Sequence, residues 1–393
     1  AFVYTMVLLP ALLALLPLPA PRVGAISRGS FPMENLLVST GTFAVRHPYR
    51  VLLPVGLIVV LGVLGAMQTR FSHNGLRWFP EDDRVRLDAA EIDERLGGSV
   101  SVEVIVDARE PGGLYDPVVL EAIDEFIRRV EPLPVAPLKI GKSLSMLDIL
   151  KETHLALNEN REEMRRIPSD RALVAQELLL FENSGSEDTE EFVDTEYRRA
   201  RISMRVPFVD ALFYPKLISD IRTLAEKRLR PHVDFEITGL MTLLAQIMDA
   251  VIDSMLRSYI FALCVITPMM MFLVGSLRRG LVAMVPNLLP VLAVLGTAGW
   301  LGIAFDSTTM MLGAMVIGIA VDDTIHFMHK FHRYFDELGD VEAAICETLR
   351  TTGSALLFTT LVLATGFSVF LLGELSNLRI FGGLAAMATI VAF

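Results

Sequence analysis

Apolar residues are gathered into long uncharged runs, and most charged residues lie in one extended polar region between the second and third runs. A helix needs about 20 apolar residues to cross the hydrocarbon core of a bilayer, so runs of this length predict transmembrane helices. The runs cover residues 1–21, 51–69, 258–277, 280–305, 307–321, 351–373 and 380–393. We therefore predict an α-helical polytopic membrane bundle of about six spans, in which the first and the last are truncated.

The polar region, residues 70–256, alternates between strand and helix patterns. Residues 99–106 and 199–206 alternate with period two, as half-buried strands do, and residues 233–237 predict a third strand. Helical spacing marks residues 117–130 and 213–229, and residues 187–196 predict a loop. This order predicts an α/β domain with helices on one face of a sheet. From Gly239 the helical pattern continues into the next apolar run, so we expect one long helix to join domain and bundle.

The composition indicates a hydrated polar domain and a separate apolar bundle. Hydrophobic residues make up 52% of the chain and the mean hydropathy is +0.49, yet 21% of the residues are charged. Residues 69–255 hold 36 of the 46 acids and 24 of the 35 bases, net −12, which leaves +1 for the remainder. An acidic surplus argues against nucleic acid as a partner. The only cysteines, Cys264 and Cys346, lie outside this region, so neither a disulfide framework nor a cysteine zinc site is expected there.

Basic residues in short loops predict the orientation, because Lys and Arg favour the cytoplasmic side. If every run crosses once, three basic clusters share one side of the membrane: Arg22, Arg28, Arg46 and Arg50; Arg278 and Arg279; and Lys330, Arg333 and Arg350. Residues 22–50 are then a cytoplasmic linker, and residues 331–349 a cytoplasmic amphipathic helix. The domain of residues 70–256 is expected on the extracytoplasmic side.

Two adjacent carboxylates, Asp322 and Asp323, end the uncharged run of residues 307–321. An Asp at the centre of a membrane helix costs roughly 2.5–3.5 kcal/mol on insertion scales, so such residues mark functional sites. Helical spacing places Asp322 on one face with Ala314, Gly318, His326 and His329. Two carboxylates in a low dielectric do not both ionise easily, so the pair is expected to share a proton. The alternative is a structural pair that faces water or a neighbouring helix.

Other polar residues in the apolar runs are weaker candidates. Thr359 and Thr360 could hydrogen-bond the Asp pair or, equally, their own helix carbonyls. Asn287, between Pro286 and Pro290, predicts a kinked helix with a satisfied amide rather than a ligand. The spacing of the histidines predicts no metal site, and we expect no cofactor, because nucleophile triads and phosphate-binding Gly loops are also missing from the sequence. ATP is therefore not the expected energy source, and an enzyme is not predicted.

Several motifs carry a family resemblance. They are His47-Pro48 before a span, NGLRWFPEDD at residues 74–83, Leu96-Gly97-Gly98, Pro286-Asn287-Leu-Leu-Pro290, and Gly318-Ile-Ala-Val-Asp322-Asp323-Thr-Ile-His326. With them the chain resembles the C-terminal half of a resistance-nodulation-division (RND) transporter. The branch includes the MMPL exporters, hopanoid exporters and sterol-sensing-domain (SSD) proteins such as Patched.

The resemblance implies twelve transmembrane helices in two six-helix repeats. Residues 1–21 would end helix six, residues 51–69 would be helix seven, and residues 257–393 would hold helices eight to twelve. The Asp pair would lie on helix ten, where the lipid-exporter and Patched-like branch also carries an acid. A missing N-terminal repeat of the same protein is the implied partner, and a homo-oligomer stays open.

These observations predict a secondary active transporter of the cytoplasmic (inner) membrane. The proton-motive force would drive efflux of hydrophobic or lipid-like compounds by proton antiport, in contact with membrane lipids. Asp322 would accept the proton, Asp323 would modulate its protonation, and His326, Thr359 and Thr360 would be relay partners. The alternative is a non-transporting sterol-sensing-like receptor or a protein-export accessory protein.

Overall fold

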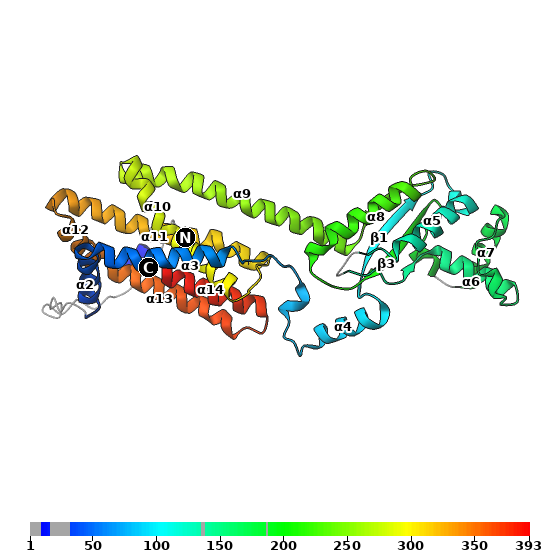
Figure 1. Cartoon of the computed structure of the whole chain (residues 1–393), viewed down its shortest axis with the longest axis horizontal. Coiled ribbons are helices and arrows are strands. Elements are labelled where there is room, and N and C mark those ends of the chain that lie inside the picture. The colour runs from blue at the N-terminus through cyan, green and yellow to red at the C-terminus, as the bar shows by residue number, and fades with distance from the viewer. Residues whose placement is uncertain (1–8, 16–31, 135–137, 186–187) are drawn as a thin grey trace. The chain divides into compact units, whose positions relative to one another are not determined.

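The computed structural model describes residues 9–15, 32–134, 138–185 and 188–393 (Figure 1). Within these residues, five helical segments are long and apolar enough to cross a membrane. They are α3 (Pro48–Ala66), α9 (Leu240–Val274), α10 (Leu277–Trp300), α11 (Ser307–Leu338) and the segment Val341–Leu372. The last segment joins α12 (Val341–Thr348), the π-turn η7 (Leu349–Gly353), α13 (Ser354–Ser368) and the short η8 (Val369–Leu372).

The two truncated spans predicted at the ends of the chain are described to different extents in the structure. Most of residues 1–21 lie outside the described residues, which include only α1 (Leu9–Leu15) of that run. Residues 380–392 fall within α14 (Ser376–Ala392), an apolar helix of 17 residues that is shorter than a full span. Within the described part of the chain, the structure therefore has five full-length candidates where about six spans were predicted.

The polar region folds around a four-stranded antiparallel sheet of order β2-β3-β1-β4. The strands are β1 (Val100–Asp107), β2 (Ser143–Leu144), β3 (Arg199–Val206) and β4 (Asp234–Thr238). Helix α5 (Pro117–Val130) connects β1 to β2, and α8 (Tyr214–Arg228) connects β3 to β4. This is the order of the split β-α-β, or ferredoxin-like, motif. The five elements predicted here are confirmed to within one residue at each end.

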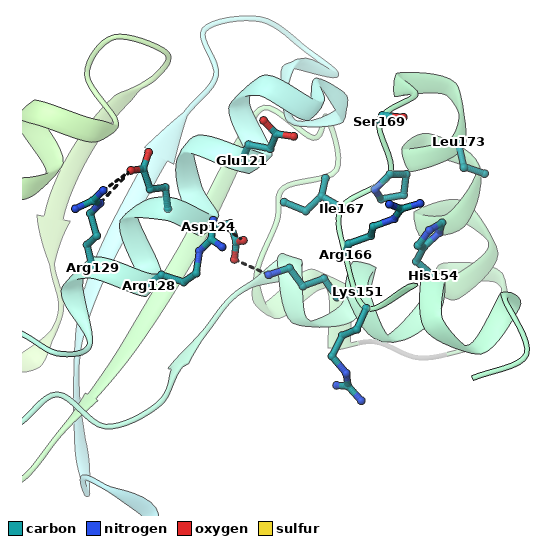
Figure 2. A pocket seen from close by; sticks show the side chains of 13 residues that line it. Glu121, Asp124, Arg128, Arg129, Lys151, His154, Arg166, Ile167, Ser169 and Leu173 are labelled. Atoms are coloured by element: carbon teal, nitrogen blue, oxygen red, sulfur yellow. Dashed lines mark hydrogen bonds and ion pairs between the residues drawn. The ribbon is translucent and has the colours of Figure 1, made fainter. Parts of the chain in front are cut away.

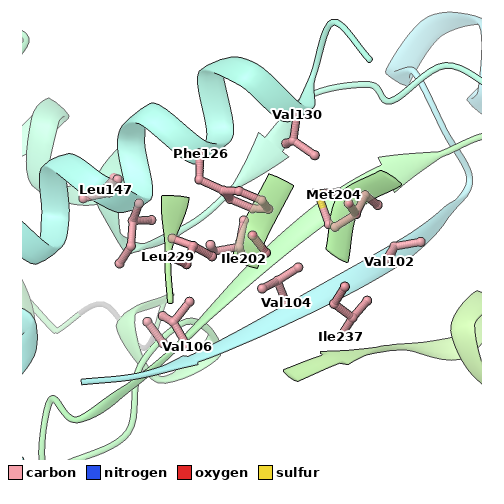
Figure 3. Packing of buried hydrophobic residues seen from close by; sticks show 14 of the residues in the cluster. Val102, Val104, Val106, Phe126, Val130, Leu147, Ile202, Met204, Leu229 and Ile237 are labelled. Atoms are coloured by element: carbon pink, nitrogen blue, oxygen red, sulfur yellow. The ribbon is translucent and has the colours of Figure 1, made fainter. Parts of the chain in front are cut away.

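One face of this sheet is buried and the other is polar. In β1 the side chains of Val102, Val104 and Val106 are fully buried, and those between them are not. They form one core with Phe126 of α5 and residues of α8, as Figure 3 shows for the side of α5. The opposite face carries charged and hydroxyl groups such as Glu103 and Ser203, which hydrogen-bond across the strands at 2.9 Å. The prediction of helices on one face of the sheet is confirmed.

Several helices of this region were not predicted. Helix α4 (Arg84–Leu96) precedes the sheet, and α6 (Met146–Leu157) and α7 (Arg171–Asn183) are inserted between β2 and β3. Single turns of 3-10 helix occur at η2 (Gly75–Trp78), η3 (Gly113–Tyr115), η4 (Glu162–Met164), η5 (Asp188–Glu191) and η6 (Ala211–Phe213). The turn η5 lies in the segment predicted as a loop. Helices α4, α6 and α7 all begin at a side-chain cap, from Asp83, Ser145 and Asp170 respectively.

Helix α9 belongs to both the domain and the bundle, as predicted from the unbroken pattern after Gly239. Its first turns place Met241 and Ala245 in the core of the sheet domain, where both are almost fully buried. Its later residues form an apolar segment of spanning length. At 1.5 Å per residue, its 35 residues extend for about 52 Å.

Glycines bring α3 and α10 into backbone contact. Gly62 and Gly65 of α3 face Gly296 and Gly299 of α10, and a Cβ atom on Gly65 would collide with the carbonyl oxygen of Gly296. The indole Nε1–H of Trp300 donates to the carbonyl of Leu61 at 3.0 Å beside this contact. Small residues at a helix interface allow this close approach in a membrane.

Two predicted segments differ in the structure, and both lie in a separate compact unit that includes α2 and α12. The predicted linker of residues 22–50 contains α2 (Pro32–Arg46), which packs against α12 and η7: Arg46 pairs with Glu342 at 2.8 Å. The single amphipathic helix predicted for residues 331–349 is wrong. Helix α11 continues to Leu338, and Gly339, with a φ of 69°, ends it before Asp340 caps α12. The sequence pattern ran across this break because both helices are amphipathic.

Replacing Gly65 with Val should destabilise the bundle by about 1–3 kcal/mol, because the added atoms have no space against α10. Gly56→Val is the matched control in the same helix, since nothing lies within 4 Å of a Cβ placed there. Thermal unfolding of the detergent-solubilised chain, followed by tryptophan fluorescence, measures both. Equal unfolding temperatures for the two variants would contradict the glycine contact.

A soluble fragment of residues 83–250 should fold cooperatively, whereas one ending at Thr238 should be less stable by about 2–3 kcal/mol. The shorter fragment loses the buried side chains of Met241 and Ala245 from its core. Urea unfolding of both fragments, followed by circular dichroism, gives the difference. If the two have the same stability, the start of α9 is not part of the domain core.

Candidate functional site

Helix α11 carries the predicted acid pair, and its start is fixed by a reciprocal cap. The backbone N–H of Thr309 donates to Oδ1 of Asp306 at 2.8 Å, and the backbone N–H of Asp306 donates to Oγ1 of Thr309 at 2.8 Å. Both residues are buried. This cap fixes the residue at which α11 begins, and the helix then determines on which sides Asp322 and Asp323 lie.

The face predicted for Asp322 is the outward face of α11. Ala314, Gly318, Asp322, His326 and His329 are all exposed in this chain. The side chain of Asp322 is 73% exposed and that of His326 is 64% exposed. On the opposite face, α11 buries Leu312, Val316, Ile317, Ala320 and Val321. The helix thus presents a strip of small residues that leads to an acid and two imidazoles.

Asp322 and His326 lie one helical turn apart, with 3.7 Å between Oδ1 and Nε2. This separation is too long for a direct hydrogen bond but suits an ion pair or a single bridging water. Asp323 points in a different direction and is half-buried. The two carboxylates therefore have different surroundings, one on the outer surface of the chain and one partly enclosed by it.

A polar contact beside Asp323 links α11 to α10. The hydroxyl of Thr324 donates to Oδ1 of Asn287 at 2.5 Å and also lies 3.0 Å from the carbonyl of Ala320. Asn287 is only 1% exposed, and its amide nitrogen lies 3.4 Å from the carbonyl of Ala283. The predicted satisfied amide at Asn287 is thus observed. The helix α10 runs without interruption from Leu277 to Trp300 through both prolines.

Thr324 was missed by the sequence analysis, although it directly follows the two acids. The available signal was a pair of uncharged polar residues, Asn287 and Thr324, in successive apolar helices of the sequence. Of the two threonines proposed as relay partners, Thr360 is buried and Thr359 is exposed on α13. Their contact with the acid pair stays a prediction.

Because Asp322 is exposed, the surroundings of this face of α11 in a membrane matter: lipid, protein or water could lie against it. A charged side chain at the centre of the bilayer is costly in lipid, so such residues face protein or water-filled cavities. Asp322 and His326 can each bind and release a proton, and the helix places them in one column. Chemically, the arrangement can take up a proton and pass it along α11.

Comparison with known proteins relates this chain to a family of membrane proteins. Residues 214–393, which run from α8 to α14, match the model of the MMPL family. This part of the chain is similar to the MMPL family. The match includes Asp322, Asp323 and Asn287, and it identifies a membrane protein of the RND and MMPL type, as the sequence resemblance predicted.

A relative extends the similarity to most of the chain. The protein named "Putative membrane protein MJ1562" from Methanocaldococcus jannaschii is 22% identical over 374 residues. The alignment covers 90% of this chain and 89% of the relative. The similarity therefore includes the sheet domain as well as the apolar helices.

Substituting Thr324 with Val should lower the stability of the bundle by about 1–3 kcal/mol, because the buried amide oxygen of Asn287 loses its donor. Thr324→Ser keeps the hydroxyl and should remain close to wild type. The unfolding temperature of the detergent-solubilised chain tests this. Identical values for the Val and Ser variants would show that the α10–α11 hydrogen bond contributes nothing.

Proposed function

We propose that this chain works in a secondary active transporter that uses the proton-motive force to export hydrophobic or lipid-like compounds. The MMPL match and the five apolar helices support a transporter-like, multi-pass membrane protein rather than an enzyme. The observation that carries the proposal is the acid pair Asp322 and Asp323 inside an apolar helix of spanning length. Such acids are retained in membrane helices chiefly where they bind protons, ions or substrates.

In this proposal Asp322 accepts the proton and His326 passes it along the exposed face of α11. Asp323 modulates the protonation of Asp322, because two neighbouring carboxylates repel each other when both are ionised. The Thr324–Asn287 hydrogen bond fixes the backbone beside the pair, so that a change of charge acts on the position of α11 relative to α10. Thr359 and Thr360 are further candidates for the relay.

We further propose that another six-helix unit covers the exposed face of α11. Gly318 has open space where a Cβ would lie, and Ala314 is exposed one turn earlier, so a neighbouring helix could come close there. A carboxylate on this surface would then contact protein and water instead of lipid. The unit could be an N-terminal repeat of the same protein or a second copy of the chain.

The proposed location is the cytoplasmic (inner) membrane, with the sheet domain on the extracytoplasmic side. The distribution of Lys and Arg in the short loops supports this orientation. The acidic form of helix ten and the modest size of the polar region support a hydrophobic or lipid-like substrate. Both arguments rest on resemblance to the lipid-exporting branch of the family.

Asp322→Asn in the full-length protein should reduce efflux at least tenfold, because Asn keeps the size of Asp but cannot carry the proton. Efflux of the lipophilic dye Nile red from cells, with and without a protonophore, measures the effect. Asp323→Asn should reduce efflux less. Expression and membrane insertion should be unchanged, because a neutral side chain inserts at lower cost.

Asp336→Asn is the matched control, since Asp336 is an exposed carboxylate further along the same helix. It should leave efflux unchanged. Wild-type efflux from the Asp322→Asn variant would exclude the relay. Dye efflux that is absent from the wild type, or insensitive to the protonophore, would favour the non-transporting receptor or accessory protein.

A further inference from the structure

The sheet domain contains an open cleft of about 1040 Å³, far from α11 in the sequence. One wall is α5, and the other is formed by α6, the segment of residues 165–169 and the start of α7 (Figure 2). Five Lys or Arg residues and three acids line it, a surplus of two positive charges. This surplus is notable because residues 69–255 as a whole carry a net charge of −12.

Most of the lining charges are already paired. Lys151 lies 2.5 Å and Arg128 lies 3.4 Å from the same carboxylate, Asp124, so two cations share one acid. Arg129 pairs with Glu125 at 2.9 Å. Arg165 pairs with Glu162 at 3.2 Å, outside the cleft. The α5 wall, with three acids and two arginines, has a net charge of −1, and Lys151 of the opposite wall pairs with its Asp124 across the cleft.

Of the four arginines that line the cleft, Arg166 has no acidic partner among the described residues. In the described part of the chain its side chain makes one polar contact, a weak one of 3.8 Å to the sulfur of Met164. It is exposed and lines the wall opposite α5 (Figure 2). Glu121, the lining acid without an ion pair among the described residues, lies on the α5 wall instead. The two walls thus differ in the sign of their unpaired charge.

A buried histidine completes the wall that carries Arg166. His154 is 7% exposed and lines the cleft, and its Nδ1 lies 2.7 Å from Oε1 of Glu177. Glu177 is 3% exposed and does not line the cleft, so it contacts the imidazole from behind. Among the described residues its second oxygen, Oε2, has no hydrogen-bond partner. This carboxylate fixes the orientation of the imidazole at the cleft surface.

We propose that this cleft binds a phosphate-type oxyanion, with Arg166 as the principal contact and Lys151 and His154 beside it. A guanidinium suits this role because its planar fork of N–H donors matches two oxygens of a phosphate. The apolar side chains of Ile167 and Leu173 line the same cleft. The anion can therefore be free phosphate or the phosphomonoester headgroup of a lipid, since both present the same oxygens.

This site goes beyond the proposed transport and does not depend on it. None of its lining residues belongs to α11, and oxyanion binding requires no proton transfer at Asp322. A protein that fails to transport could still bind the anion. A functional transporter could equally lack the site.

Calorimetric titration of the whole chain in non-ionic detergent tests the proposal. The probes are inorganic phosphate and, separately, dihexanoyl phosphatidate, with zwitterionic dihexanoyl phosphatidylcholine as the reference. Arg166→Gln should weaken saturable binding at least tenfold. Arg166→Lys, which keeps the charge but loses the fork, should have intermediate affinity. Arg95→Gln is the matched control, because Arg95 is an exposed, ion-paired guanidinium on α4, outside the cleft.

The two probes distinguish the sources of the anion. Binding of inorganic phosphate that weakens in Arg166→Gln assigns the site to free phosphate, and the same result for phosphatidate alone assigns it to a lipid headgroup. Unfolding temperatures of the variants should equal that of wild type, since the Arg166 side chain is exposed. Absence of saturable binding by wild type, or equal affinity in Arg166→Gln and wild type, would overturn the proposal.

Discussion

Helix α10 can contact four neighbours because its residues are small or uncharged wherever it meets another helix. Glycines bring it to α3, Asn287 bonds to α11, and Gly280 packs directly against Met271 of α9. Val294 and Ala298 form an apolar cluster with Ala385 and Ala388 of α14. In a bilayer these contacts cannot depend on the hydrophobic effect, so close packing and interhelical hydrogen bonds such as Thr324–Asn287 and Trp300–Leu61 have to hold the helices together. A larger side chain at one contact would move several helices at once.

The position of the acid pair follows from this arrangement. Thr324 faces α10, and residues two positions away on a helix lie about 200° apart, so Asp322 is turned away from α10. Asp323, one residue from Thr324, is left partly enclosed. A rotation of α11 that preserved the Thr324 contact would leave Asp322 on the outside. The same hydrogen bond that stabilises the bundle therefore determines which carboxylate is available to a partner.

Local patterns predicted much of this fold. Strands β1 and β3 and helix α5 followed directly from period two and from helical spacing, and the shared face of α11 that carries Asp322 and His326 followed from its register, although its exposure did not. Features that depend on distant residues could not be predicted this way. The Thr324–Asn287 bond joins residues 37 positions apart, and the cleft around Arg166 joins α5 to α6 and α7. The helix predicted across residues 331–349 was wrong because amphipathic spacing was followed through Gly339 and Asp340, the glycine that ends α11 and the cap that begins α12.

Helix α9 connects the sheet domain mechanically to α11. Ala245 is fixed in the core of the sheet domain, and the hydroxyl of Tyr259 donates to the carbonyl of Met310 in α11. The 13 residues between these anchors contain neither Pro nor Gly, and the two anchors lie about 21 Å apart along the helix. Bending at Pro268 would occur beyond Tyr259 and would not interrupt this stretch. A tilt of α11 by a few degrees would therefore reach the sheet as a displacement of about an ångström, with α9 acting as a lever.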